Sequence, residues 1–171
     1  MTSLEERIAL LEDRTAISDV VIRYCMAVDT RDWELFSTCF DEAVTTEYDA
    51  YGDSVQQQSR EEMVAYVASV LDGFTKTQHL SSNHVIRFGP DGHDAVCRSQ
   101  MHAQHFLDGE TSDQHYVLRA IYDNHMVRTA AGWRISGIHS HHRWVDGNEE
   151  QAIGEARARA AHVHPGQAQG Q

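Results

Sequence analysis

The chain has 171 residues, of which 41% are hydrophobic and 23% charged, and this predicts a single domain with one hydrophobic core. Its 14 basic and 26 acidic residues give a formal net charge of -12 with the histidines neutral, which argues against a nucleic-acid partner. No apolar run approaches the roughly 20 residues of a membrane helix, and no secretory signal is visible. Three scattered cysteines, Cys25, Cys39 and Cys97, do not make a disulfide framework. We therefore expect a cytoplasmic protein with buried free thiols and no membrane partner.

The beginning of the chain shows helical patterns followed by a strand. Apolar residues recur at helical spacing over residues 4–28, which predicts a long amphipathic helix. Residues 33–40 predict a second, shorter helix. The segment Glu42–Tyr51 is rich in Val, Thr and Tyr and predicts a strand, with a turn at residues 52–53.

The spacing of apolar residues changes from helical to alternating after Gly73. Before that residue, Ser59 and Glu62 have the spacing of a capping box, so we expect a third helix that begins there and stops at Gly73. After it, alternation and strong turn signals predict four strands: His79–Phe88, Asp94–Phe106, Gln114–Thr129 and Trp133–Val145. Strands joined by short turns pair antiparallel, so we expect one α+β domain over residues 1–147 with an antiparallel sheet.

The C-terminal tail, residues 148–171, has a different composition. Glu149–Ala161 consists largely of Ala, Arg and Glu and predicts a surface helix. His164–Gln171 is rich in Gly, Gln and Ala and predicts disorder. Because the tail offers few apolar residues as anchors, we expect it to be dispensable for folding.

The predicted strand Asp94–Phe106 separates into two faces, because successive side chains point in opposite directions. One face is small and mostly apolar, as in the wall of a pocket: Ala95, Cys97, Ser99, Met101, Ala103 and His105. The other face is polar and suits solvent or a subunit interface: Val96, Arg98, Gln100, His102 and Gln104. His105 is therefore expected to face a cavity, and its alternative interpretation is a core histidine with a satisfied hydrogen bond.

Twelve histidines in a chain of this length point to proton transfer or metal ligation. The pair His139-x-His141 has the even spacing that puts both rings on one face of a strand, and His142 follows directly. A zinc or iron site there would need a third ligand, for which His79 is the candidate, and a carboxylate. The alternative is a set of polar residues on a terminal strand, and we assign no metal from the sequence.

Several segments, taken in order, resemble a known family: Ala27–Trp33 (AVDTRDW), Thr77–Leu80 (TQHL), His102–Phe106 (HAQHF), Gly132–Ile135 (GWRI) and Arg143–Trp144. Over most of the chain they resemble the SnoaL-like branch of the nuclear transport factor 2-like superfamily. The resemblance suggests three functional relatives within this branch: scytalone dehydratase, hexachlorocyclohexane dehydrochlorinase and bile-acid 7α-dehydratase. The resemblance implies a cone, in which a curved antiparallel sheet wraps around helices and encloses an apolar pocket.

The resemblance also implies three catalytic residues. In scytalone dehydratase, an aspartate at the end of the first helix is paired with a histidine late in a long strand, and these match Asp29 and His105 here. A second catalytic histidine matches His79, and in the other two enzymes the general base stands at that place, so the identity of the base stays open. Val28 replaces the tyrosine that precedes the aspartate in scytalone dehydratase, which argues against scytalone as the substrate. We expect four further residues to contact a substrate: Tyr24, Tyr48, Met101 and Tyr122.

These features predict a cofactor-independent lyase or isomerase, of the dehydratase, dehydrohalogenase or cyclase type. It would use Asp–His acid–base chemistry on a small, apolar, oxygenated or cyclic molecule. The alternative is a non-catalytic ligand-binding or assembly module, similar to the β subunit of ring-hydroxylating dioxygenases, because one fold hosts both. A metal-dependent enzyme using His139, His141 and His142 is a third possibility. We also expect a homo-oligomer, either a dimer or a trimer, because family members associate through the sheet.

Overall fold

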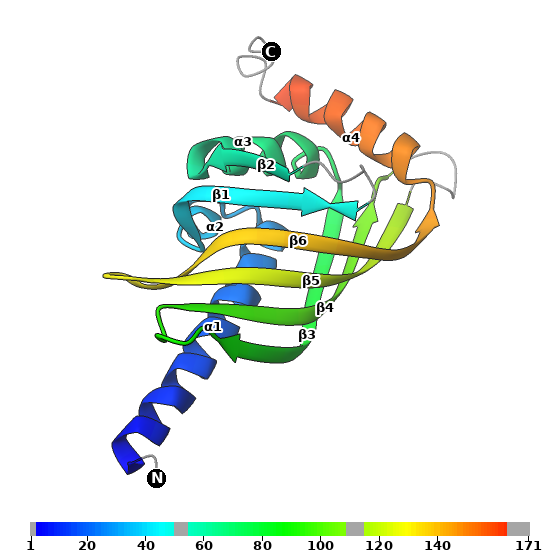
Figure 1. Cartoon of the computed structure of the whole chain (residues 1–171). Coiled ribbons are helices and arrows are strands. Elements are labelled where there is room, and N and C mark those ends of the chain that lie inside the picture. Colours follow the sequence, from blue (N-terminus) through cyan, green and yellow to red (C-terminus); the bar gives the residue numbers. More distant parts are fainter. Residues whose placement is uncertain (1–2, 50–54, 109–114, 164–171) are drawn as a thin grey trace.

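The computed structural model describes residues 3–49, 55–108 and 115–163 (Figure 1). Its elements, in chain order, are α1 (Leu4–Thr30), α2 (Trp33–Ser37), β1 (Phe40–Tyr48), β2 (Val55–Ser59), α3 (Arg60–Leu71), β3 (Lys76–Phe88), β4 (Asp94–Phe106), β5 (His115–Thr129), β6 (Gly132–Gly147) and α4 (Glu149–Val163). The predicted α+β class is confirmed. Among the described helices, none is both long and apolar enough to cross a membrane.

The six strands form one curved, open sheet in the order β2-β1-β6-β5-β4-β3. Strands β3 to β6 pair antiparallel, as predicted, but β1 runs parallel to β6, so the expectation of a purely antiparallel sheet is wrong. No hairpin joins β1 to β6, because α3 and four other strands lie between them in the chain. A connection of this length allows the two strands to run in the same direction. We call the face of the sheet that packs on α1 the inner face and the opposite one the outer face.

The alternation predicted for β4 is confirmed residue by residue. Its inner face is buried, from Ala95 to His105, and three of its outer residues, Arg98, Gln100 and Gln104, are exposed. The core lies between this inner face and the buried stripe of α1, which includes Ile17, Val21 and Val28. All three cysteines are free and buried, as expected.

The structure differs from the sequence-based expectations around β1 and β2. The second helix ends at Ser37, and Phe40, which was assigned to it, begins β1. Strand β2 was missed because its sequence, VQQQS, shows no alternation of apolar residues. It pairs antiparallel with β1 at the edge of the sheet, and most of its residues are exposed. Tyr51, the predicted turn at residues 52–53, Gln114 and the segment 164–171 lie outside the described residues.

The tail was expected to lack anchors, and this is wrong for its helical part. Helix α4 buries one stripe of alanines, Ala152, Ala156 and Ala160, and it packs against α3. Gly73, just after α3, allows the close approach, since a Cβ built there would lie 1.7 Å from the Ala156 carbonyl oxygen. The sequence pattern did not predict the contact between α3 and α4, because each alanine contributes little apolar area. The small alanine side chains nevertheless allow the two backbones to lie close together.

Candidate active site

Asp29 and His79 form the centre of the candidate site. Asp29 lies in the last turn of α1 and His79 near the start of β3, with Asp29 Oδ1 placed 2.7 Å from His79 Nδ1. Asp29 Oδ2 accepts a hydrogen bond of 2.7 Å from the His79 backbone N–H, and Oδ1 accepts one of 2.9 Å from Thr77 Oγ1. Thr77 and His79 are two residues apart on a strand, so both face α1, and together they hold the carboxylate in one orientation.

Arg31 supports this arrangement from the end of α1. Its backbone is left-handed, with φ of 59°, which ends the helix and costs a non-glycine residue roughly 1–2 kcal/mol. The guanidinium donates to the Val28 carbonyl oxygen at 2.6 Å and to Thr77 Oγ1 at 2.8 Å. Because the Thr77 hydroxyl accepts from Arg31, its single proton is directed to Asp29.

The charge state of Asp29 fixes the tautomer of His79. Burial opposes ionisation of Asp29, but the hydrogen bonds from the His79 ring, the His79 backbone and Thr77 outweigh it, so the pKa of this carboxyl lies below its usual range. An ionised carboxylate only accepts hydrogen bonds, so a neutral His79 ring carries its proton on Nδ1 and its lone pair on Nε2. Nε2 makes no hydrogen bond to any other described residue, and it is the nitrogen available to a substrate.

His105 lies beside this pair in a different environment. Its ring is perpendicular to that of His79, with the ring centroids 5.1 Å apart, and it stacks on Tyr116 at 4.2 Å. Burial lowers the pKa of His105 to about 3, and the charges of His79 and Arg31 act in the same direction. The His105 ring is therefore neutral near pH 7, and it can donate or accept a hydrogen bond without carrying charge.

The two histidines line an inner cavity of about 130 Å³. The wall is otherwise largely aromatic and aliphatic, and it includes five tyrosines: Tyr24, Tyr48, Tyr66, Tyr116 and Tyr122. Burial raises the pKa of Tyr24 well above its usual value, so its hydroxyl stays protonated. The Nδ1 atoms of His105 and His142, which also lines the cavity, are buried without a hydrogen-bond partner among the described residues. Such unpaired atoms in a cavity wall are available to a ligand.

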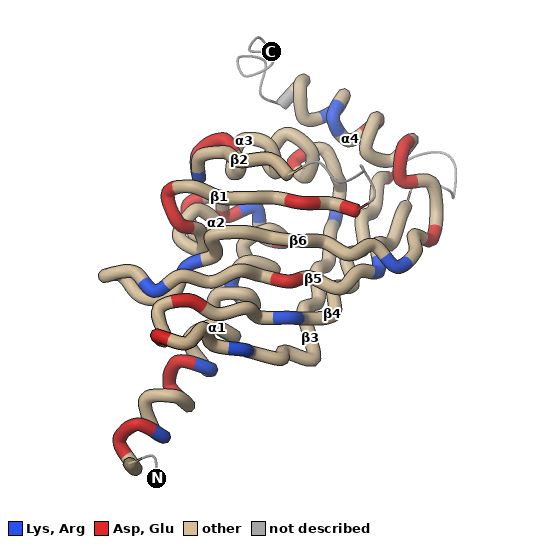
Figure 2. Tube along the Cα trace, in the orientation of Figure 1, with Lys and Arg blue, Asp and Glu red and all other residues tan. Residues whose placement is uncertain are grey.

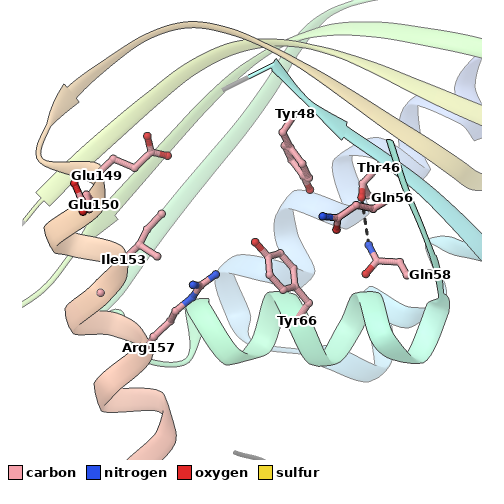
Figure 3. A pocket seen from close by; sticks show the side chains of 10 residues that line it. Thr46, Tyr48, Gln56, Gln58, Tyr66, Glu149, Glu150, Ile153 and Arg157 are labelled. Carbon is pink, nitrogen blue, oxygen red and sulfur yellow. Dashed lines mark hydrogen bonds between the residues drawn. The ribbon is translucent and has the colours of Figure 1, made fainter. Parts of the chain in front are cut away.

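A wider hollow of about 700 Å³ adjoins the inner cavity, since the two share Tyr48, Tyr66, Glu149, Ile153 and Arg157 as lining residues. Figure 3 shows Tyr48 and Tyr66 pointing toward one another across it, with Arg157 of α4 beside Tyr66. The Arg157 guanidinium carbon lies 5.9 Å from the centre of the Tyr66 ring. Helix α4 thus forms one wall of the route to the inner cavity.

The structure brings together most of the residues that the sequence singled out. Asp29, His79 and His105 lie side by side, and Tyr24, Tyr48 and Tyr122 line the inner cavity. Met101 is buried on the same face of the sheet but is not among the lining residues, so its assignment as a substrate contact is not supported.

Several lining residues were missed, among them Tyr66 of α3. Tyr116 has the same parity on β5 as Tyr122, so alternation could have found it. His142 faces inward beside Ala120, whereas its neighbour His141 faces outward, and two register shifts between β5 and β6 hide this from simple counting. Arg157 and Ile153 belong to α4, whose packing the sequence did not predict.

The histidines of β6 do not form the group that the sequence suggested. His139 and His141 lie together on the outer face, His142 lines the inner cavity, and His79 is bound to Asp29. A metal site made of His139, His141 and His142, or one completed by His79, is therefore excluded by this arrangement.

Comparisons with known proteins agree with this fold. Residues 9–139 match the model of the SnoaL-like domain family, which is more than half of the chain. No curated protein is significantly similar to the chain in sequence.

Three solved structures show the likeness. The Kfla4162 protein from Kribbella flavida has a TM-score of 0.75 and 22% identity, with 86% of this chain and 99% of that chain covered. A putative scytalone dehydratase from Novosphingobium aromaticivorans has a TM-score of 0.71 and 19% identity, covering 81% and 89%. The hexachlorocyclohexane dehydrochlorinase LinA-type3 from Novosphingobium barchaimii has a TM-score of 0.69 and 15% identity, covering 84% and 94%. At these identities the likeness to solved structures shows the fold alone. The match to the family model over more than half of the chain shows that the protein belongs to the SnoaL-like domain family of the nuclear transport factor 2-like superfamily.

Proposed function

We propose that the protein is a cofactor-independent lyase or isomerase in which His79 is the general base. The observation that carries this proposal is the Asp29–His79 pair in the wall of a tyrosine-lined cavity. A histidine held in one orientation by a partly buried carboxylate can take a proton from carbon, because the carboxylate stabilises the imidazolium that forms. Two structural neighbours bear the names scytalone dehydratase and hexachlorocyclohexane dehydrochlorinase, both of which denote eliminations, and this supports the proposal.

In an elimination, His79 Nε2 would take a proton from a substrate carbon next to the carbon that bears the leaving group. The electron pair of the C–H bond forms the new double bond, and the leaving group departs with the electron pair of its own bond. The proton on His79 then passes to a departing hydroxide, giving water, or to solvent when the leaving group is a halide. Asp29 stabilises the imidazolium that forms, and Thr77 and Arg31 keep the carboxylate in place. In an isomerisation, the same imidazolium returns the proton to a different carbon.

His105 and the tyrosines would act on the other end of the reacting bond. The His105 ring is neutral and therefore suited to hydrogen-bond a departing hydroxyl or halide, or an enolate oxygen, while His79 holds the proton. Tyrosine hydroxyls such as that of Tyr24, which stay protonated, can donate in the same way. We thus assign the base to His79 and a hydrogen-bonding role to His105.

The cavity favours a small ring as the reacting part of the substrate. An apolar cavity of about 150 Å³ is large enough for benzene, and the inner cavity here is of similar size. The adjoining hollow is lined by Gln56, Gln58, Glu150 and Arg157 and could hold a polar substituent. We therefore expect a hydroxylated or halogenated cyclic compound with the reacting carbons at the inner end.

The test is a panel of hydroxylated and halogenated cyclic compounds, incubated with the protein without added cofactor and followed by mass spectrometry. Loss of water or halide, or exchange of a substrate C–H for deuterium in D₂O, is expected with the wild type and absent with His79→Gln. Compounds that raise the thermal midpoint but show neither loss nor exchange would favour the non-catalytic binding module instead.

A further inference from the structure

A second cluster of histidines and carboxylates lies on the outer face of the sheet, away from the inner cavity. Asp49, just beyond β1, places Oδ1 at 2.7 Å from His139 Nε2 and Oδ2 at 3.3 Å from His141 Nδ1. One potential ligand atom from each of the three residues lies within 4.8 Å of the other two. The rings of His139 and His141 stack loosely, with their centroids 3.8 Å apart. Three metal-binding groups therefore converge on one point.

The strand register explains why they meet. His139 and His141 are two residues apart on β6, so their rings share a face of the sheet. Strand β1 runs parallel beside β6, with Glu47 opposite His139 and Tyr48 opposite Ser140, which brings Asp49 level with His141. The parallel pairing that the sequence did not predict is thus what supplies the carboxylate.

A second carboxylate lies near each ring. His139 Nδ1 lies 3.5 Å from Glu47 Oε2, and His141 Nε2 lies 3.1 Å from Asp123 Oδ2. Both oxygens of Asp123 accept hydrogen bonds from the Arg98 guanidinium. Histidine ligands of metals usually donate their other N–H to a carboxylate or carbonyl, which fixes the ring and leaves the lone pair for the metal. His141 has that arrangement through Asp123, and Glu47 lies within ion-pair distance of the corresponding nitrogen of His139. In both rings the nitrogen nearest Asp49 is the one left to bind a metal.

The charges around the cluster are not balanced. Three carboxylates, those of Glu47, Asp49 and Asp123, face one guanidinium, that of Arg98, which leaves two negative charges when both imidazoles are neutral. A divalent cation between the rings and Asp49 would neutralise this charge. Figure 2 shows the acidic segments at the end of β1 and in the middle of β5, with a basic segment of β4 beside the latter.

We propose that Asp49, His139 and His141 bind a divalent transition-metal ion of the zinc class on the outer face of the sheet. Two imidazoles and one carboxylate suit zinc and its neighbours, whereas calcium and magnesium prefer sites made of oxygen atoms alone. Tetrahedral zinc, with bonds of about 2.0–2.1 Å, separates its ligand atoms by about 3.3 Å. The three candidate ligand atoms lie within 4.8 Å of one another, so small side-chain movements would bring them to this spacing. A water molecule would complete the four ligands. The ion would join the end of β1 to β6.

The experiment titrates chelator-treated, untagged protein with Zn²⁺ by calorimetry, and with Co²⁺ by absorption, where tetrahedral nitrogen and oxygen ligands give a visible spectrum. We expect one ion bound per chain, a raised thermal midpoint, and a loss of at least tenfold in affinity for Asp49→Asn and for His141→Gln. Asp123→Asn, which removes the second carboxylate of His141, should weaken binding by about 10–100-fold.

The matched control is His102→Gln, which removes a histidine from the same outer face of the sheet but from β4. It should leave the stoichiometry and affinity unchanged. The proposal is overturned by the absence of saturable binding, by full affinity in His141→Gln, or by equal loss in His102→Gln. Circular dichroism of each variant separates loss of binding from loss of fold.

Discussion

Both faces of the sheet carry histidines beside carboxylates, but the two faces arrange these residues differently. On the inner face, one ring, His79, is held by one carboxylate, Asp29, and the side chain of that ring is 8% exposed. On the outer face, two rings, His139 and His141, share Asp49, whose side chain is 45% exposed. The inner pair keeps one ring nitrogen unused beside an apolar cavity, whereas both nitrogens of each outer ring lie near carboxylates. The first arrangement suits the movement of a proton, and the second suits a cation.

The number and spacing of histidines in the sequence do not distinguish a proton-transfer site from a cation site. What distinguishes them is the number of carboxylates per ring and the exposure of the site, and both follow from strand register. Predictions about each face can therefore be tested separately, by changes that affect one arrangement and leave the other alone.

The largest expected effect is on catalysis at the inner pair. Asp29→Asn should keep the fold and lower the rate of substrate turnover by roughly 10²–10⁴-fold, because an amide no longer fixes the Nδ1–H tautomer of His79 or stabilises its imidazolium. His79→Gln should lower turnover at least as much, and the double variant should lose little more, because the two residues act as a unit. The measurement is kcat on a substrate identified from the panel.

The control for this series is Asp19→Asn, which makes the same chemical change on an exposed position of α1. Turnover there should stay within twofold of the wild type. Near-normal turnover in both Asp29→Asn and His79→Gln would mean that these residues have only a structural role and that His79 is not the base.

The next largest effect concerns the packing of α4, which helps to line the inner cavity. Gly73→Ala places a methyl group 1.7 Å from the Ala156 carbonyl oxygen, so α4 must move. We expect the free energy of unfolding to fall by about 1–3 kcal/mol, as in other overpacked interfaces, and the KM to rise because Ile153 and Arg157 are displaced. Denaturant titration and steady-state kinetics measure the two effects.

Gly154→Ala is the matched control, because a Cβ there meets nothing within 4 Å. It should stabilise the protein by roughly 0.5–1 kcal/mol, since alanine is the better helix former. Wild-type stability in Gly73→Ala would mean that α4 does not pack as the structure shows.

The sequence predicted the inner face better than the outer one, for a physical reason. The alternation in β4 predicted correctly that His105 faces inward, because a strand with one buried face has an apolar residue at every second position of its sequence. The position of Asp29 and His79 came from resemblance, since no local pattern shows that the end of a helix and the start of a strand 50 residues later will meet. The outer cluster depends on a parallel strand pair and on the bulges of β5 and β6, which leave no periodic signal. The packing of α4 was missed because its contact residues are alanines.

The last effect we predict is on stability in acid, where it appears only below pH 6.5, and it depends on the buried ring of His105. This ring has a pKa of about 3 in the folded protein, because burial disfavours its charged form, against about 6.5 in an unfolded chain. Between these values the unfolded chain binds a proton that the folded one does not, so stability falls as the pH drops below 6.5.

His105→Phe keeps a ring between Tyr116 and Phe74 but removes the group that binds this proton. The loss of unfolding free energy from pH 6.5 to 5 should therefore shrink by roughly 1.5–2 kcal/mol. Asp29, whose pKa is lowered, adds its own loss only below about pH 4, outside this range. Denaturant titrations at the two pH values measure the difference, with His93→Gln, at an exposed turn, as a control that should keep the wild-type slope. An unchanged slope in His105→Phe would show that the ring already takes up a proton in the folded state, and the hydrogen-bonding role assigned to a neutral His105 would then be wrong.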